Sequence, residues 1–253
     1  MSRRHVHALR GGVGFLTRLP VPTHEGDWEA FTRTPAIFPV VGALVGAIAA
    51  LPLVAIGTVP APTVALAYLG AIYLLTGVNH LDGVADLGDA AAVHGGPDRR
   101  REVMTDTTTG VGALLAVSIV VAGVALGGLA LTTLPIAAAV GVAVAAEVGA
   151  KLGMATMACV GTAAHDGFGS QFTDADGPSS VVSPLALALP AALLTWPSLA
   201  AGAALAGALV GGTVPWLWAR RRLGGVSGDV FGAANEVGRV AGLHAGVIAW
   251  TLS

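Results

Sequence analysis

Three aspartates are regularly spaced within an otherwise apolar stretch of the chain. Asp82, Asp86 and Asp89 lie in the segment HLDGVADLGDA at residues 80–90. Positions four and seven residues further along a helix lie within about 40° of the first, so the three carboxylates share one face of a helix. Carboxylate oxygens are ligands that Mg²⁺ prefers, commonly together with substrate phosphates. The spacing favours a magnesium site, although a hydrated polar loop would have the same composition.

A second pair of carboxylates has a helical spacing near the C-terminus. Asp229 and Glu236 are seven residues apart, and a glycine-rich turn precedes them, with Gly224, Gly225 and Gly228. Such a turn, where it runs into a helix N-terminus, can offer backbone N–H groups to phosphate, but it also fits a plain connection between a loop and a helix. Together the two acidic stripes and the turn predict a metal-dependent phosphate site.

The composition identifies the environment of these residues. Hydrophobic residues make up 54% of the chain and charged residues 11%, and the mean hydropathy is +0.76. Soluble proteins carry roughly 25% charged residues. We therefore expect one membrane domain over residues 1–253, built as an all-α polytopic helix bundle in a lipid bilayer, with the 36 glycines allowing close helix packing. The net charge of −2 says little, but the sequence lacks a strongly basic nucleic-acid surface, so we expect no nucleic acid as a partner.

Long apolar runs predict about seven membrane spans, with six to eight as the expected range. Residues 1–34 instead carry five arginines among apolar residues, which predicts a short amphipathic helix at the membrane interface. The runs lie at about 35–57, 61–79, 108–131, 134–160, 181–196, 198–219 and 238–252.

Three longer polar segments separate these runs, at 80–107, 161–180 and 220–237. Strict alternation of the spans places all three on one side of the membrane. Arginine triplets at 99–101 and 220–222 lie in these segments, whereas the short turns contain none. The positive-inside rule then predicts a cytoplasmic N-terminus and a cytoplasmic site in the cell membrane, although such triplets are also typical of simple topology anchors.

Whole motifs of the chain resemble the cobalamin synthase family, the adenosylcobinamide-GDP ribazoletransferases. The resemblance covers nearly the whole chain, in the order of the family's motifs. It implies a membrane enzyme that uses Mg²⁺ to join adenosylcobinamide-GDP with α-ribazole or its 5′-phosphate, releasing GMP late in cobalamin assembly. The matching blocks are FLTRLPVP (15–22), FPVVGALVGA (38–47), HLDGVADLGDA (80–90), MTDTTTGVGA (104–113), GFGSQF (167–172) and GGVSGDVFGAANEVG (224–238).

The resemblance also implies which residues form the site. At two positions this chain departs from the family's pattern. Lys151 stands where many members of the family have an arginine. Lysine keeps the positive charge but lacks the planar guanidinium group that binds phosphate through two hydrogen bonds. The Asp106 block lacks a Ser-Arg pair that is common in the family. The acidic positions carried over by motif are Asp82, Asp86, Asp89, Asp106, Asp229 and Glu236, with Asn235 beside the last.

A mechanism follows as a hypothesis. The 3′-hydroxyl of the ribazole attacks the phosphorus nearer the cobinamide while GMP departs. Asp82, Asp86 and Asp229 would hold Mg²⁺, with Asp89 and Glu236 as further candidate metal ligands, and Asp89 or His80 would take the proton. His80 fits equally well a residue that makes one hydrogen bond at a helix start. Glu147 and Lys151, four residues apart, are spaced for an ion pair on one helix.

Two other functions fit parts of the pattern. CDP-alcohol phosphotransferases also place aspartates on membrane helices, but their motif expects an arginine that is absent after Ala85. A cation-coupled transporter would hold its carboxylates near the bilayer midplane, commonly between internal repeats. The acidic residues here lie mostly at one membrane edge, and no repeat is evident.

Overall fold

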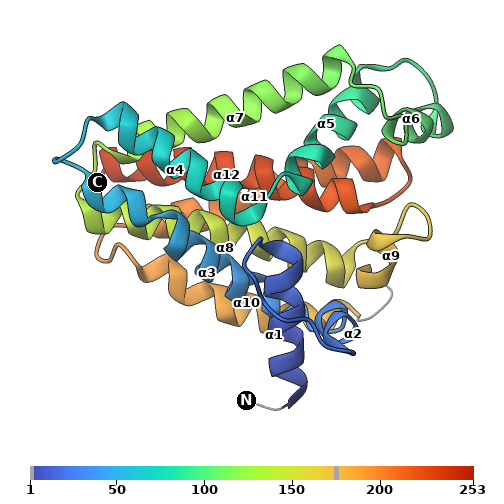
Figure 1. Cartoon of the computed structure of the whole chain (residues 1–253), viewed down its shortest axis with the longest axis horizontal. Coiled ribbons are helices and arrows are strands. Elements are labelled where there is room, and N and C mark those ends of the chain that lie inside the picture. The colour runs from blue at the N-terminus through green and yellow to red at the C-terminus, as the bar shows by residue number, and fades with distance from the viewer. Residues whose placement is uncertain (1–2, 174–176) are drawn as a thin grey trace.

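The computed structural model describes residues 3–173 and 177–253, and all regular elements in these ranges are helices (Figure 1). This confirms the predicted all-α class. The α-helices are α1 (Arg3–Leu16), α2 (Asp27–Thr32), α3 (Ile37–Ala49), α4 (Ala61–Thr76), α5 (Asn79–Ala92), α6 (Pro97–Met104), α7 (Val111–Leu131), α8 (Ile136–Val160), α9 (Phe168–Thr173), α10 (Val182–Ala188), α11 (Ala200–Arg222) and α12 (Gly228–Thr251). Short 3₁₀ helices are η1 (Leu51–Ala55), η2 (Pro178–Val181) and η3 (Leu189–Leu193).

Helix α8 is the central helix of the bundle. It is mostly buried, and α3, α11 and α12 pack around it. Glycines make this packing close: a Cβ atom on Gly149 would lie 2.5 Å from the carbonyl oxygen of Leu205 in α11, and one on Gly42 in α3 would lie 2.8 Å from that of Glu147. Small residues therefore let the helix backbones approach, as expected for association within lipid.

The number of membrane spans is lower than the sequence predicts. Within the described residues, four helical segments are long and apolar enough to cross a membrane alone, and a fifth span results if α4 and α5 form one broken span. The run at 181–196 forms only a shorter apolar helix, Pro178–Leu193, built of 3₁₀ and α segments. The run at 238–252 is the second half of α12, whose first half carries charged residues. The prediction of about seven spans is therefore wrong for these two runs. The four segments are Ile37–Ala55, Val111–Leu131, Ile136–Val160 and Ala200–Arg222.

A sharp bend separates α4 from α5. Helix α4 has 16 residues, about 24 Å of helix, which is less than the roughly 30 Å of a bilayer core. The chain then turns by 94° at Gly77 and Val78. Gly77 has φ = +72°, a backbone conformation that favours glycine. The bend directs α5, with its aspartates, toward one end of the bundle (Figure 1).

The three polar segments meet at that end and so lie on one side as predicted, although the run at 181–196, one of the spans behind the predicted alternation, is too short to be one. Arg101 in α6 donates to the carbonyl oxygen of Leu223 at 2.7 Å, which joins the first segment to the third. The backbone N–H of Ala164 donates to the carbonyl of Val226 at 2.9 Å, which joins the second to the third. In Figure 1, α6, α9 and the turn from α11 to α12 lie together at the right.

The N-terminal helix packs against the protein through its small residues. A Cβ atom on Gly11 would lie 2.3 Å from the carbonyl oxygen of Asp27. The guanidinium of Arg10 donates to both carboxylate oxygens of Asp27, at 3.0 and 2.7 Å, and His7 contacts the same carboxylate at 2.6 Å. These contacts, with the hydrogen bond from Arg10 as the largest cause, hold the pKa of Asp27 well below its usual range.

Candidate active site

Helices α5 and α12 touch backbone to backbone. A Cβ atom on Gly83 would lie 2.4 Å from the carbonyl oxygen of Asp229, and one on Gly232 would lie 3.0 Å from the Cα of His80. Only glycine permits such an approach. The contact brings the N-terminal turn of α12, with Asp229, beside Asp82 on α5. The two acidic stripes predicted from sequence thus meet at this crossing.

The aspartates of α5 line a cavity of about 390 Å³, here called the acidic cavity. Asp82 and Asp86 enter it from α5, and residues 104–109 form the opposite wall with several threonines. Asp106 belongs to that wall; its carboxylate accepts a hydrogen bond from the Thr108 N–H at 3.0 Å, which lowers the pKa of Asp106. The cavity therefore combines carboxylates with hydroxyl and backbone groups.

The carboxylates of Asp82, Asp86 and Asp229 have no basic ion-pair partner within the described residues. Neighbouring like charges disfavour one another, so a cation would stabilise all three. No three Asp, Glu, His or Cys side chains in the described ranges converge closely enough to enclose a metal ion. Mg²⁺ fits this arrangement, because it commonly takes one or two carboxylates and completes its octahedron with water and substrate phosphate.

Asp89 has both carboxylate oxygens occupied by backbone groups. It accepts hydrogen bonds from the N–H of Gly110 at 2.7 Å and of Ala113 at 2.9 Å, at the start of α7. A carboxylate at this position satisfies free N–H groups and interacts favourably with the helix dipole. Asp89 shares the predicted stripe and borders the acidic cavity, but its contacts anchor α7.

A second cavity, of about 210 Å³, lies on the other side of Asp82. We call it the aromatic cavity. Three of its five polar residues, His80, Asp82 and Asp229, border it where α5 meets α12, and Gly228 borders it at the start of α12. Asp82 is thus shared by both cavities. The other lining residues are Phe15, Phe38, Thr76, Asn79, Met154, Phe168, Phe172, Phe231 and Gly232.

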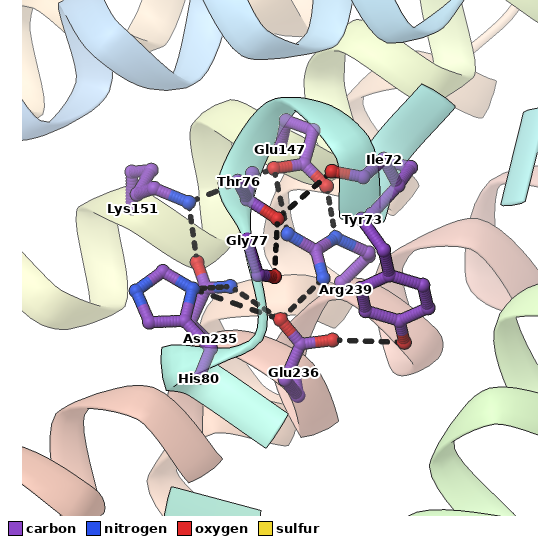
Figure 2. A network of polar contacts seen from close by, with 10 residues as sticks. All are labelled: Ile72, Tyr73, Thr76, Gly77, His80, Glu147, Lys151, Asn235, Glu236 and Arg239. Atoms are coloured by element: carbon purple, nitrogen blue, oxygen red, sulfur yellow. Dashed lines mark hydrogen bonds and ion pairs between the residues drawn. The ribbon is translucent and has the colours of Figure 1, made fainter. Parts of the chain in front are cut away.

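Glu236 lies away from the acidic cavity, in a buried network of charges (Figure 2). The guanidinium of Arg239 lies between Glu236 and Glu147 and donates to both, including an Nη2–Oε2 bond of 3.3 Å to Glu147. Tyr73 donates to Glu236 at 3.3 Å. Seven residues of α12, about 10 Å along its axis, separate Glu236 from Asp229. The predicted metal ligand Glu236 is therefore neutralised by Arg239.

Lys151 extends the same network to His80 through Asn235. The Lys151 ammonium donates to Asn235 Oδ1 at 2.7 Å and lies 3.7 Å from Glu147, the ion pair that the spacing predicts. Because lysine only donates, the NH₂ group of Asn235 faces His80 Nδ1, at 3.1 Å. Nδ1 of His80 is then an acceptor, and a neutral ring carries its proton on Nε2. Lys151 is fully buried and lines neither cavity.

Two glycines of the glycine-rich turn are required by the local backbone structure. Gly224 has φ = +88°, and a Cβ atom on Gly225 would lie 2.4 Å from the carbonyl oxygen of Thr162. Gly228 is the glycine that reaches the aromatic cavity. Next to it, Ser227 donates its hydroxyl to Asp229 at 3.2 Å. Of the three predicted phosphate-binding glycines, Gly228 borders the aromatic cavity, and Gly224 and Gly225 border neither of the two cavities.

Sequence reasoning missed the aromatic lining and the role of Arg239. All six phenylalanines of the chain belong to one ring cluster, and five of them line the aromatic cavity. A signal was present, because these five lie within the blocks that carry the family resemblance. For Arg239, the signal was a charge within an apolar helix, which requires a partner.

Sequence comparison finds a matching family and named relatives over most of the chain. A family model described as cobalamin-5-phosphate synthase matches residues 8–247. The adenosylcobinamide-GDP ribazoletransferase of Halorubrum lacusprofundi is 54% identical over 253 residues, which covers 96% of this chain and 98% of that protein. The protein of the same name from Haloquadratum walsbyi is 45% identical, with 98% and 99% covered. The one from Halobacterium salinarum is 57% identical over 196 residues, covering 78% of this chain and 98% of its own.

No solved structure matches this chain. The family match spans every element that forms the two cavities, from the end of α1 to α12. Its relatives of known name are transferases, and their similarity extends over nearly their full lengths. This chain therefore belongs to the cobalamin-5-phosphate synthase family.

Proposed function

We propose that this protein joins adenosylcobinamide-GDP with α-ribazole, or its 5′-phosphate, and releases GMP, in a Mg²⁺-dependent reaction at the cytoplasmic face of the cell membrane. The observation that carries the proposal is the position of Asp82, which borders both the acidic and the aromatic cavity. A diphosphate in one cavity and a nucleoside-like acceptor in the other would meet at this residue. The names of the relatives supply the two substrates.

The proposed chemistry is a displacement at phosphorus. The 3′-oxygen of the ribazole forms a bond to the phosphorus nearer the cobinamide, and the bond from that phosphorus to the oxygen of GMP breaks. Asp82 and Asp86 would hold Mg²⁺, which would neutralise the charge on the diphosphate oxygens. GMP leaves with the bond electrons, and the hydroxyl proton passes to a base.

We assign that base to Asp229. It borders the aromatic cavity but not the acidic one, so its carboxylate can face the acceptor hydroxyl while Asp82 and Asp86 face the diphosphate. The two bases considered from sequence fit less well. Asp89 holds two backbone N–H groups, and His80 Nδ1 accepts from Asn235. His80 suits donation of the Nε2 proton in a hydrogen bond to a substrate oxygen.

The N-terminus of α12, which begins at Gly228, adds an electrostatic field that favours negative charge. Gly228 and Asp229 form the first turn of α12, and the N-terminus of a helix attracts negative charge. Phosphoryl oxygens that reach from the acidic cavity toward Asp82 approach this end of α12. Lys151 and Asn235 contribute indirectly. Lys151 holds Asn235, and the hydrogen bond between Asn235 and His80 fixes the orientation of the His80 ring.

A direct assay tests the proposed function. The protein is reconstituted in lipid nanodiscs and supplied with adenosylcobinamide-GDP, α-ribazole and Mg²⁺, and both GMP and the corrinoid product are quantified by mass spectrometry. We expect equal amounts of the two products and no product when Mg²⁺ is chelated. Turnover of a CDP-alcohol with no turnover of adenosylcobinamide-GDP would instead identify a CDP-alcohol phosphotransferase.

A further inference from the structure

We propose that the aromatic cavity binds the flat base of the ribazole substrate, with the ribose directed toward Asp82 and Asp229. This inference rests on the proposed function and assigns one substrate to one cavity. It also makes the phenylalanines of the cavity determinants of acceptor specificity. The alternatives are the guanine base of the GDP group and the corrinoid ring.

The ring cluster brings together distant parts of the chain. Phe172 on α9 is its centre, with ring centroids 5.5 Å from Phe38 on α3, 5.7 Å from Phe231 on α12 and 6.3 Å from Phe15 on α1. Phe168 lies 5.9 Å from Phe15. These pairs are tilted, with interplanar angles from 31° to 59°. Ring faces and edges at such spacings are the geometry in which a further aromatic ring is favourably accommodated.

The polar residues of the cavity are confined to one region. His80, Asp82 and Asp229 come from the crossing of α5 and α12, where Gly83 and Gly232 hold the backbones together. The two other polar residues of the lining, Thr76 and Asn79, lie next to this crossing in the chain, at the end of α4 and the start of α5. The phenylalanines from α1, α3 and α9 form the remaining wall. A ligand that is apolar at one end and carries hydroxyls at the other fits this division, and a benzimidazole-type riboside has that form.

The guanine base fits less well. Guanine carries amide and amino groups along its edge, and burying a polar group without a hydrogen-bond partner is unfavourable. The phenylalanine wall offers no such partner. The corrinoid ring is excluded by size, because about 210 Å³ is below the roughly 300–1,000 Å³ of pockets for drug-sized ligands. Size and polarity together favour a single flat ring system.

The test compares the binding of the two substrates to the reconstituted full-length protein. In Phe168→Ala, the Kd of α-ribazole should rise about 5- to 150-fold, the range found when an aromatic side chain that stacks on a base is removed. The Kd of adenosylcobinamide-GDP should change less than about twofold on this account. Phe168 is 56% exposed, so the substitution removes little of the folded core. Phe15→Ala, at a residue 40% exposed, is a second variant with the same expected result.

Leu199→Ala is the matched control, because Leu199 is 70% exposed and lines neither cavity. It should leave both Kd values unchanged. Weaker binding of adenosylcobinamide-GDP with unchanged α-ribazole binding in both phenylalanine variants would overturn the inference in favour of guanine. Unchanged binding of both substrates would also overturn it. A wild-type protein that neither binds α-ribazole nor releases GMP would instead refute the proposed function.

Discussion

Gly83 of α5 lies directly against Asp229 of α12, so closely that a Cβ atom on Gly83 would stand 2.4 Å from the Asp229 carbonyl oxygen. This contact joins two segments about 150 positions apart in the chain. It explains why Asp229 lies beside Asp82 at one end of the bundle. The spacing between Asp82 and Asp229 depends on a residue with no side chain.

Gly83→Ala should therefore reduce activity through geometry. The added methyl group forces α5 and α12 apart, and a displacement of about 1 Å in an active site can lower turnover on the order of 100-fold. GMP release by the reconstituted variant measures the effect. Gly70→Ala is the control, because a Cβ atom on Gly70 in α4 meets nothing within 4 Å. Equal turnover of the two variants would show that the close approach is not required.

The buried charges should contribute to stability as a set. Arg239→Gln leaves Glu147 and Glu236 buried with Lys151 as their only cation in the network, and breaking a buried pair costs about 3–5 kcal/mol. Thermal unfolding in detergent should show a clear fall in Tm. Arg99→Gln removes an exposed ion pair with Glu102, worth about 0–1 kcal/mol, and should hardly change it. Similar losses in the two variants would contradict a structural role for the network.

Asp89 should behave as an anchor of α7. Asp89→Ala removes the acceptor of two backbone N–H groups, which costs about 0.5–2 kcal/mol when it occurs at a helix start. Hydrogen exchange at Gly110 and Ala113 should accelerate, while the Mg²⁺ affinity stays within about threefold of wild type on this account. Loss of Mg²⁺ binding with unchanged exchange would make Asp89 a metal ligand instead.

Asp27 should make the packing of α1 on α2 sensitive to acid. Its pKa is depressed in the folded protein, chiefly by Arg10, so its stabilising effect is present above the unfolded value of about 3.9. That effect is lost as the pH falls below 3.9 toward the folded pKa. Asp27→Asn should thus be less stable than wild type at pH 7, with the difference shrinking below about pH 4. Limited proteolysis of the α1–α2 region measures it, and a difference that widened in acid would contradict this assignment.

Local patterns allowed the helical class and one acidic helix to be predicted. The spacing of Asp82, Asp86 and Asp89 correctly placed them on one helix, and the three polar segments between apolar runs lie together as predicted, although not all of those runs are spans. Both depend on periodicity and connectivity, which a single sequence carries.

The different roles of acidic residues on the same helical face could not be predicted from the sequence. Asp229 and Glu236 share a helical face, but Glu236 meets Arg239 deep in the bundle while Asp229 reaches a cavity. Partners from α8, such as Glu147, decide this difference, and they are about 90 residues away in the chain. The 94° bend after α4 likewise depends on Gly77 and on how the bundle packs, so the apolar pattern alone suggested a straight span.

The assignment of Asp229 as the base separates proton transfer from metal binding. Asp229→Asn should lower turnover about 100-fold or more, the usual contribution of a general base. Its Mg²⁺ affinity, measured by calorimetry in the presence of adenosylcobinamide-GDP, should stay near that of wild type. A variant that loses Mg²⁺ binding would move Asp229 into the metal site.

The most direct test of the whole account is Mg²⁺-dependent GMP release from adenosylcobinamide-GDP by Asp82→Asn and Asp86→Asn in nanodiscs. We predict that both variants assemble in the membrane like wild type but show no Mg²⁺-dependent release. Glu29→Gln, at an exposed carboxylate paired only with Arg33, should retain it. Near-normal GMP release by both aspartate variants would contradict a metal-dependent site at the crossing of α5 and α12.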